Sequence, residues 1–330
     1  MISRLRRGSR KDQQMRAKAD AITQGENGVC LLCREPQPRV QSHILPAFAF
    51  KALKKHSVTG HIRHSENPNR RVQDGETRPW LCIACEARFS QWERDFCNHV
   101  FHPWMSGAPR TPYQEWMLKF CTSVSWRVLN FCKGANPNTT YSADDDKLFD
   151  EAELVWRQFL LDKLPHPGKF SQQFLIFDTI SKTSVPNLPV NINRFMSNAI
   201  AMDIAGSSDS AFTWAKIGKF QIFGIVKEGQ DRFKNLKIHV KDGEIKPGKF
   251  TIPGGLISFY KQKAEHARQG LENLSQNQID KIDSAFDAAV RSDPDRVRSS
   301  NNFKAMMADA EMFGRDAIIR KTTPKSSDES

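Results

Sequence analysis

The chain has 330 residues, of which 39% are hydrophobic, and its formal net charge is +12. This length suits about two domains, and 22 Phe and 7 Trp supply apolar volume for a packed core. No apolar run approaches the roughly 20 residues that span a bilayer, and the basic first residues lack the apolar segment of a secretory signal. The composition therefore excludes a membrane-spanning chain and favours a cytoplasmic protein with no membrane partner.

Most of the positive charge lies near the N-terminus. Residues 1–78 contain 16 Lys or Arg and 7 Asp or Glu, a net charge of +9, whereas the other 252 residues contribute +3. Such an excess at one end is typical of proteins that bind a polyanion, usually nucleic acid. Residues 1–27 are expected to form a basic arm. Eight further residues are candidates for phosphate contacts: Arg39, Lys51, Lys54, Lys55, Arg63, Arg70, Arg71 and Arg78.

The seven cysteines include two Cys-x-x-Cys pairs, Cys30 with Cys33 and Cys82 with Cys85, within 56 residues. In a reducing compartment such pairs more often bind a metal ion than form disulfides. Zinc prefers four thiolate or imidazole ligands in a tetrahedron, and two such pairs complete that shell. A thioredoxin-like redox pair opens a helix after a strand, and neither pair is expected to have that setting. The spacing predicts one structural zinc ion held by all four thiolates, with an iron–sulfur cluster as the alternative.

Between the two pairs lies the segment SHILP, residues 42–46. Two Cys-x-x-Cys pairs around such a His-Ile-x-Pro segment resemble the zinc-bearing branch of the HNH nucleases, over residues 28–100. The resemblance implies a treble-clef or ββα-metal fold in which His43 is the general base that activates water. It also implies a Mg²⁺ or Mn²⁺ ion beside His43, held by the preceding acidic residue and by a His or Asn on the following helix.

Three features depart from this family pattern. The Asn that the family has just before the second pair is missing here, and Asn67 and Asn69 are the nearest candidates. Ser42 replaces the acidic or histidine neighbour of the base, and Glu86 stands where the family commonly has His or Asn. A carboxylate suits a hard divalent cation, so Glu86 is the candidate ligand of the catalytic metal. If residues 85–101 form a helix, Glu86 and Glu93 fall on one face and can both point toward His43. The interval before the second pair offers further candidate ligands: His61, His64 and Asp74.

A connector of two helices is expected over residues 111–165. Apolar residues recur at steps of three and four from Trp116 to Phe131, and again from Leu148 to Phe159. The acidic cluster Asp144–Asp146 suits the N-terminus of the second helix, where the helix dipole favours negative charge.

A different pattern begins near residue 166. Short runs rich in β-branched and aromatic residues predict an antiparallel sheet. These runs are residues 174–180, 212–217, 219–226, 236–240 and 249–253. Asp242-Gly243 predicts a hairpin turn between the last two runs, and residues 193–204 are expected to form a buried helix beside the sheet. The helices expected after the sheet are residues 256–274, 279–290 and 303–320.

The sequence therefore predicts an α+β protein in five parts. They are a basic arm (1–27), a zinc-binding HNH-like domain (28–110), a helical connector (111–165), an α+β domain with an antiparallel sheet (166–320) and a disordered tail (321–330). The α+β domain carries no recognisable chemistry and is the expected site of any protein partner.

The preferred function is that of a metal-dependent HNH-like endonuclease or nickase acting on nucleic acid, with DNA the expected substrate. Its cofactors would be structural Zn²⁺ and catalytic Mg²⁺ or Mn²⁺. Two alternatives stay open. One is a non-catalytic zinc-finger protein that binds nucleic acid, and the other is an interaction scaffold that zinc stabilises.

Overall fold

The computed structural model describes residues 26–135 and 142–318. Most of the expected basic arm, and the expected tail, lie outside the described residues. Contacts between residues divide the chain into two compact units. Each unit is assembled from segments that are far apart in the sequence. Unit 1 comprises Met1–Leu45, Glu76–Phe170 and His239–Pro247, and unit 2 comprises Pro46–Gly75, Ser171–Ile238 and Gly248–Ser330.

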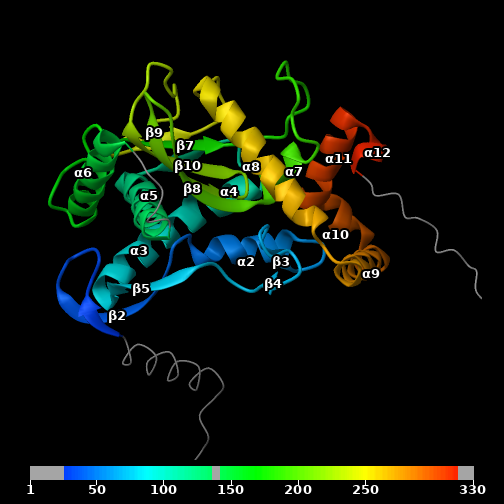
Figure 1. The fold of residues 1–330 in the computed structure, drawn as a ribbon, viewed down its shortest axis with the longest axis horizontal. Coiled ribbons are helices and arrows are strands. Elements are labelled where there is room, and N and C mark those ends of the chain that lie inside the picture. The colour runs from blue at the N-terminus through cyan, green and yellow to red at the C-terminus, as the bar shows by residue number, and fades with distance from the viewer. Residues whose placement is uncertain (1–25, 136–141, 319–330) are drawn as a thin grey trace, which may run out of the picture. The chain divides into compact units, whose positions relative to one another are not determined.

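Unit 1 is built on a three-stranded antiparallel sheet with the order β1-β2-β5. Its strands are β1 (Glu26–Val29), β2 (Pro36–His43) and β5 (Thr77–Cys82). Helix α3 (Ile83–Phe96) begins directly after β5 (Figure 1). Two paired strands followed at once by a helix form the ββα arrangement that the sequence predicted.

The rest of unit 1 is mainly helical. The run of α3 continues through a π-helical turn, η1 (Cys97–Phe101), into the short α4 (His102–Met105). Helices α5 (Glu115–Ala135) and α6 (Ala143–Leu160) lie where two helices were expected. Ser142 caps α6 by accepting a hydrogen bond from the Asp145 amide at 3.1 Å. The acidic cluster therefore lies in the first turn of α6, as its charge predicted.

The predicted hairpin turn at Asp242-Gly243 is wrong. Residues Gly243–Ile245 form β11, which pairs antiparallel with the distant strand β6 (Thr111–Tyr113). Gly243 permits this pairing, because a Cβ atom there would lie 2.3 Å from the Tyr113 hydroxyl. Gly243 is therefore needed because it leaves space for the Tyr113 ring. It does not form a turn.

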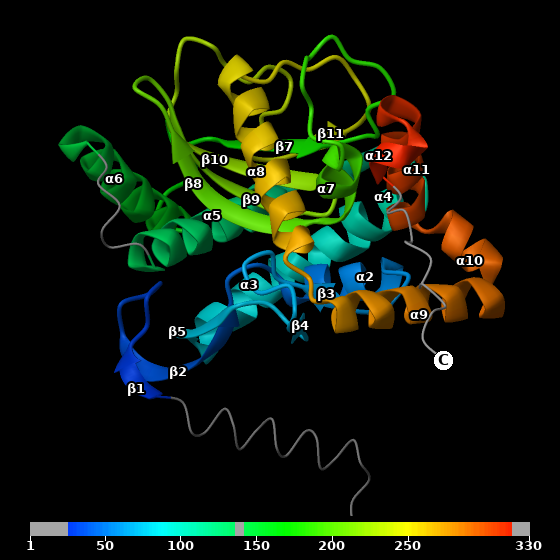
Figure 2. The same ribbon diagram turned by 45° about the vertical axis from the view of Figure 1, so that its right-hand side comes forward.

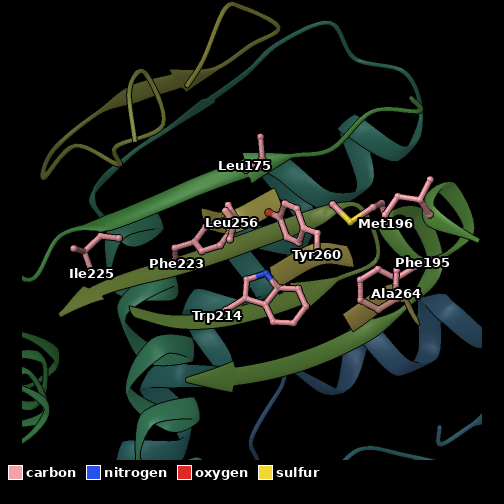
Figure 3. Packing of buried hydrophobic residues seen from close by; sticks show 10 residues of the cluster. Leu175, Phe195, Met196, Trp214, Phe223, Ile225, Leu256, Tyr260 and Ala264 are labelled. Carbon is pink, nitrogen blue, oxygen red and sulfur yellow. The ribbon is translucent and has the colours of Figure 1, made fainter. Parts of the chain in front are cut away.

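Unit 2 contains a four-stranded antiparallel sheet with the order β7-β10-β9-β8. Its strands are β7 (Gln172–Ile176), β8 (Ile200–Gly206), β9 (Ala211–Ile217) and β10 (Phe220–Lys227). Helix α8 (Gly254–Glu272) crosses one face of this sheet (Figure 2), and α7 (Ile192–Asn198) lies beside it. Figure 3 shows the core between them, where Trp214 and Phe223 of the sheet meet Leu256 and Tyr260 of α8.

The prediction of one helix over residues 193–204 is wrong in its second half. Helix α7 ends at Asn198, and the chain then forms β8, which pairs with β9 along its whole length. The apolar residues of this stretch suit either a helix or a strand, and the tertiary pairing with β9 decides between them. The expected strands at 236–240 and 249–253 contribute only single bridges, Gln173 with Lys237 and Lys234 with Thr251.

The remaining elements of unit 2 come from two distant parts of the sequence. The segment between β2 and β5 supplies α2 (Ala47–His56) and the two-residue strands β3 (Ile62–Arg63) and β4 (Arg71–Val72). The C-terminal part supplies α9 (Gln276–Ser292), α10 (Pro294–Ser299), α11 (Asn301–Phe313) and α12 (Arg315–Ile318). Among the described residues, no helix combines the length and apolar character needed to cross a membrane.

Lys216 is an unusual member of the unit 2 core because its side chain is fully buried. Its Nζ donates hydrogen bonds to the backbone carbonyls of Ala199 and Gly218, and it lies 5.3 Å from the ring centroid of Phe195. Burial lowers the pKa of Lys216 well below its ordinary value. The folded chain therefore releases this proton at a lower pH than the unfolded chain does.

We expect Lys216→Met to flatten the pH dependence of stability. Between the depressed folded pKa and the unfolded value near about 10.4, the unfolded chain binds the extra proton, so stability rises with pH by up to about 1.4 kcal/mol per unit. Urea unfolding at several pH values measures the slope. Lys234→Met, at an exposed position of the same unit, is the matched control. An unchanged slope in Lys216→Met would contradict the assignment.

Candidate metal centre

Four cysteines converge at one end of unit 1. Cys30 and Cys33 lie in the turn between β1 and β2, Cys82 ends β5, and Cys85 lies in the first turn of α3. The second pair therefore does open a helix after a strand, a setting that the sequence predicted for neither pair. The four sulfur atoms all lie within 4.8 Å of one another, and the Cys33 and Cys82 sulfurs are 4.0 Å apart. A zinc ion with Zn–S bonds of about 2.3 Å places its sulfurs about 3.8 Å apart. The cluster therefore fits a structural metal ion such as zinc, in a treble-clef arrangement.

The backbone shapes the first pair into a compact turn. The Arg34 amide donates to the Cys30 carbonyl at 2.9 Å, and the Cys30 amide donates to the Glu35 carbonyl at 2.9 Å. Arg34 has a φ of 66°, so the chain reverses through the left-handed region directly after Cys33. This turn points both sulfurs to the same side.

The local electrostatics favour thiolate at this site. The pKa of Cys30 is lowered to about 4, chiefly because the Cys85 thiol donates to it, and the Cys82 amide adds a further hydrogen bond. The Cys82 amide nitrogen lies 3.3 Å from the Cys30 sulfur. Burial raises the pKa of Cys33, and the shared hydrogen bond with Cys30 raises that of Cys85. One thiolate thus forms readily, and a divalent cation would favour deprotonation of the other three thiols by offsetting part of their negative charge.

His43 ends β2, and the residue before it points into the unit. Ser42 is fully buried, and its hydroxyl donates to the Glu86 carboxylate at 2.7 Å. Glu86 lies in the first turn of α3, directly after the last cysteine ligand. A hydrogen bond therefore connects Ser42 with Glu86, two of the positions at which this sequence departs from the HNH pattern.

Glu86 lies in a cluster of charged groups. Burial raises its pKa, while the Ser42 hydrogen bond and the charge of Arg127 lower it. The negative charge of Glu93 acts to raise the pKa, and His43 acts to lower it. The charges of Glu93, His43 and Arg127 are thus close enough to act on the Glu86 carboxylate.

Arg127 is the member of this site that the sequence did not reveal. It lies on α5, only 1% of its surface is exposed, and its guanidinium forms an ion pair with Glu93 at 2.8 Å. The same Nη1 atom donates to the His43 carbonyl at 2.9 Å, and Nε donates to the Ser123 carbonyl. The ring of Phe89 lies 5.1 Å from its Cζ atom. A single buried cation therefore ties the end of β2 to α3. An arginine inside the apolar stretch of α5 was the only available signal.

The candidate nucleic-acid contacts divide between the two units. Arg39 on β2 and Arg78 on β5 belong to unit 1, where Arg78 pairs with Glu76 at 3.0 Å and lies over the ring of Phe131. The other six, Lys51, Lys54, Lys55, Arg63, Arg70 and Arg71, belong to unit 2. The further candidate ligands His61, His64 and Asp74 also belong to unit 2.

No family model, no curated protein and no solved structure matches this chain.

We expect Arg127→Met to destabilise the protein by about 3 kcal/mol, because it leaves Glu93 as an uncompensated, largely buried charge. The double variant Arg127→Met/Glu93→Gln should recover much of this loss. Urea unfolding of the four chains of this cycle gives the coupling free energy. Arg88→Met is the matched control, because Arg88 pairs with Asp162 on the surface, where such pairs contribute at most about 1 kcal/mol. Additive effects of the two substitutions would contradict the pairing.

Proposed function

We propose that unit 1 carries an HNH-like, metal-dependent endonuclease or nickase that acts on nucleic acid, with DNA as the substrate. The observation that carries this proposal is that His43 and Glu86 lie in one charged cluster within a ββα unit, beside four cysteines arranged for a structural zinc ion. The family resemblance assigns the roles of base and metal ligand to these two positions. The unit 1 residues Arg39 and Arg78 are proposed to contact phosphate groups.

The chain's own residues would divide the work in phosphodiester hydrolysis. The His43 imidazole would accept a proton from the attacking water. The Glu86 carboxylate, oriented by the Ser42 hydroxyl, offers an oxygen ligand to a hard cation such as Mg²⁺ or Mn²⁺. Such a cation, when bound, supplies stabilisation of the charge on the pentacoordinate phosphate and the leaving oxygen.

Arg127 supports this assignment by positioning the base. Its hydrogen bond to the His43 carbonyl and its ion pair with Glu93 hold the end of β2 against α3. Because general-base catalysis depends on hydrogen-bond reach, a fixed backbone at His43 favours a productive imidazole position. The arginine would also balance one of the two carboxylates, which leaves Glu86 available for a cation.

A second candidate is a non-catalytic zinc-finger protein that binds nucleic acid. Two observations favour it. Ser42 cannot supply the charged ligand that the family places there, and its hydroxyl already engages Glu86. Arg127 supplies the cluster with a positive charge of the protein's own. The third candidate is an interaction scaffold that zinc stabilises. Unlike the other two candidates, it would not bind nucleic acid.

Plasmid nicking in Mg²⁺ or Mn²⁺ tests the nuclease proposal. We expect His43→Ala to lower the nicking rate by about 100-fold or more, because a positioned general base typically contributes that much. His99→Ala, an exposed histidine in the helical run after α3, is the matched control and should keep the wild-type rate. Equal nicking by wild type and His43→Ala would contradict the proposal. DNA binding by a wild type that never nicks would favour the non-catalytic candidate, and neither binding nor nicking would favour the scaffold.

A further inference from the structure

The segment between β2 and β5 contributes to unit 2 and not to the zinc unit that flanks it in sequence. Residues 46–75 contain six Lys or Arg and two Asp or Glu, a net charge of +4. Val58, just after α2, packs in a small apolar cluster with Ala289 of α9 and Val297 of α10. This basic segment is thus anchored on the C-terminal helices.

The basic hairpin, residues 61–72, cannot be stable by itself. Its strands β3 and β4 have two residues each, which is too short for an isolated hairpin. Arg63 and Arg71 are direct cross-strand partners, and like charges in that position repel. The hairpin is held instead by the α8–α9 corner, residues 270–278, where α8 ends and α9 begins (Figures 1 and 2).

Polar bonds fasten the basic hairpin to the α8–α9 corner. Asn69 bonds at both ends of its amide: Nδ2 donates to the Asn273 carbonyl at 3.0 Å, and Oδ1 accepts from the Ser275 amide at 2.8 Å. The guanidinium of Arg63 donates to the Gln278 side chain at 2.9 Å. These bonds join residues more than 200 positions apart, so the C-terminal helices determine where the hairpin lies.

Gly270 makes the close approach possible. A Cβ atom at this position would lie 2.4 Å from the backbone carbonyl oxygen of Ser65. Because that neighbour is backbone, a side chain at residue 270 would displace the hairpin and not merely rotate another side chain. The contact between α8 and the hairpin therefore requires glycine.

The hairpin concentrates positive charge at its surface. Arg70 and Arg71 are exposed, whereas Arg63 also donates to the Pro68 carbonyl and closes the loop. The pKa of His61 is lowered by burial and by the charges of Arg71 and Arg63. Phosphate groups bound to the exposed guanidinium groups would relieve the repulsion that the fold maintains here.

We propose that the α8–α9 corner is a platform that presents the basic hairpin to the phosphate backbone of nucleic acid. Arg70 and Arg71 contact phosphate oxygens, while Asn69 and Gly270 are positioning residues. Unit 2 therefore binds the nucleic acid through the basic hairpin, which the α8–α9 corner holds in place. This inference rests on the proposed function, since it names the unit that holds the nucleic acid.

The first test uses the two glycines of α8. Gly270→Ala in the full chain should weaken binding to a fluorescent duplex DNA by roughly tenfold, because the new Cβ displaces the hairpin and its phosphate contacts. Gly255→Ala is the matched control, because a Cβ atom at that position of α8 meets nothing within 4 Å. Alanine favours the helix at both positions, so a loss confined to Gly270→Ala does not reflect a weakened helix.

The second test counts phosphate contacts from the salt dependence of the binding constant. The logarithm of the binding constant falls with the logarithm of salt concentration by about 0.9 per phosphate contact. Arg70→Gln/Arg71→Gln should reduce that slope by about 2. Arg291→Gln/Arg296→Gln removes the same charge from exposed positions on α9 and α10 and should leave the slope unchanged.

The outcomes separate this inference from the function on which it rests. If the wild type binds DNA and Gly270→Ala or Arg70→Gln/Arg71→Gln keeps its affinity and slope, the platform is wrong and the proposed function stands. If the wild type binds neither DNA nor RNA, both fail. Tighter, hairpin-dependent binding to poly-glutamate than to DNA would overturn nucleic acid as the partner.

Discussion

Four sulfur atoms from two distant parts of the chain, with Cys30 and Cys82 52 residues apart, must occupy one small volume. Buried thiolates this close repel one another, and in small loop-rich domains a bound metal commonly supplies the missing stabilisation. The same convergence determines the register of the ββα unit, because two ligands precede β2 and the other two span the junction of β5 with α3. The positions of His43 and Glu86 follow from that junction.

Charged side chains also compensate one another next to the cysteine cluster. Glu86 and Glu93 bring two carboxylates to one face of α3, and Arg127 of α5 neutralises part of their charge from within the protein. Its hydrogen bond to the His43 carbonyl makes the helical connector part of the site. The candidate site thus extends beyond residues 28–100, and its geometry depends on a helix outside that segment.

Local signals were sufficient for some features and not for others. The cysteine cluster was predictable because each pair closes within one turn, and the start of α6 was predictable because its acidic cluster suits a helix N-terminus. The second half of residues 193–204 was not, because its apolar residues suit a strand as well as a helix until β9 pairs with it. Arg127 and the anchoring of Asn69 depend on partners 34 to 206 residues away, and such contacts leave no local pattern.

The convergence of the four thiolates on one metal ion is the claim on which the assignment of unit 1 depends. Metal analysis of the purified full chain, combined with X-ray absorption at the zinc edge, tests it most directly. We predict one zinc per chain with four sulfur ligands at about 2.3 Å. A protein without stoichiometric metal, or a metal shell with fewer than four sulfurs, would contradict it.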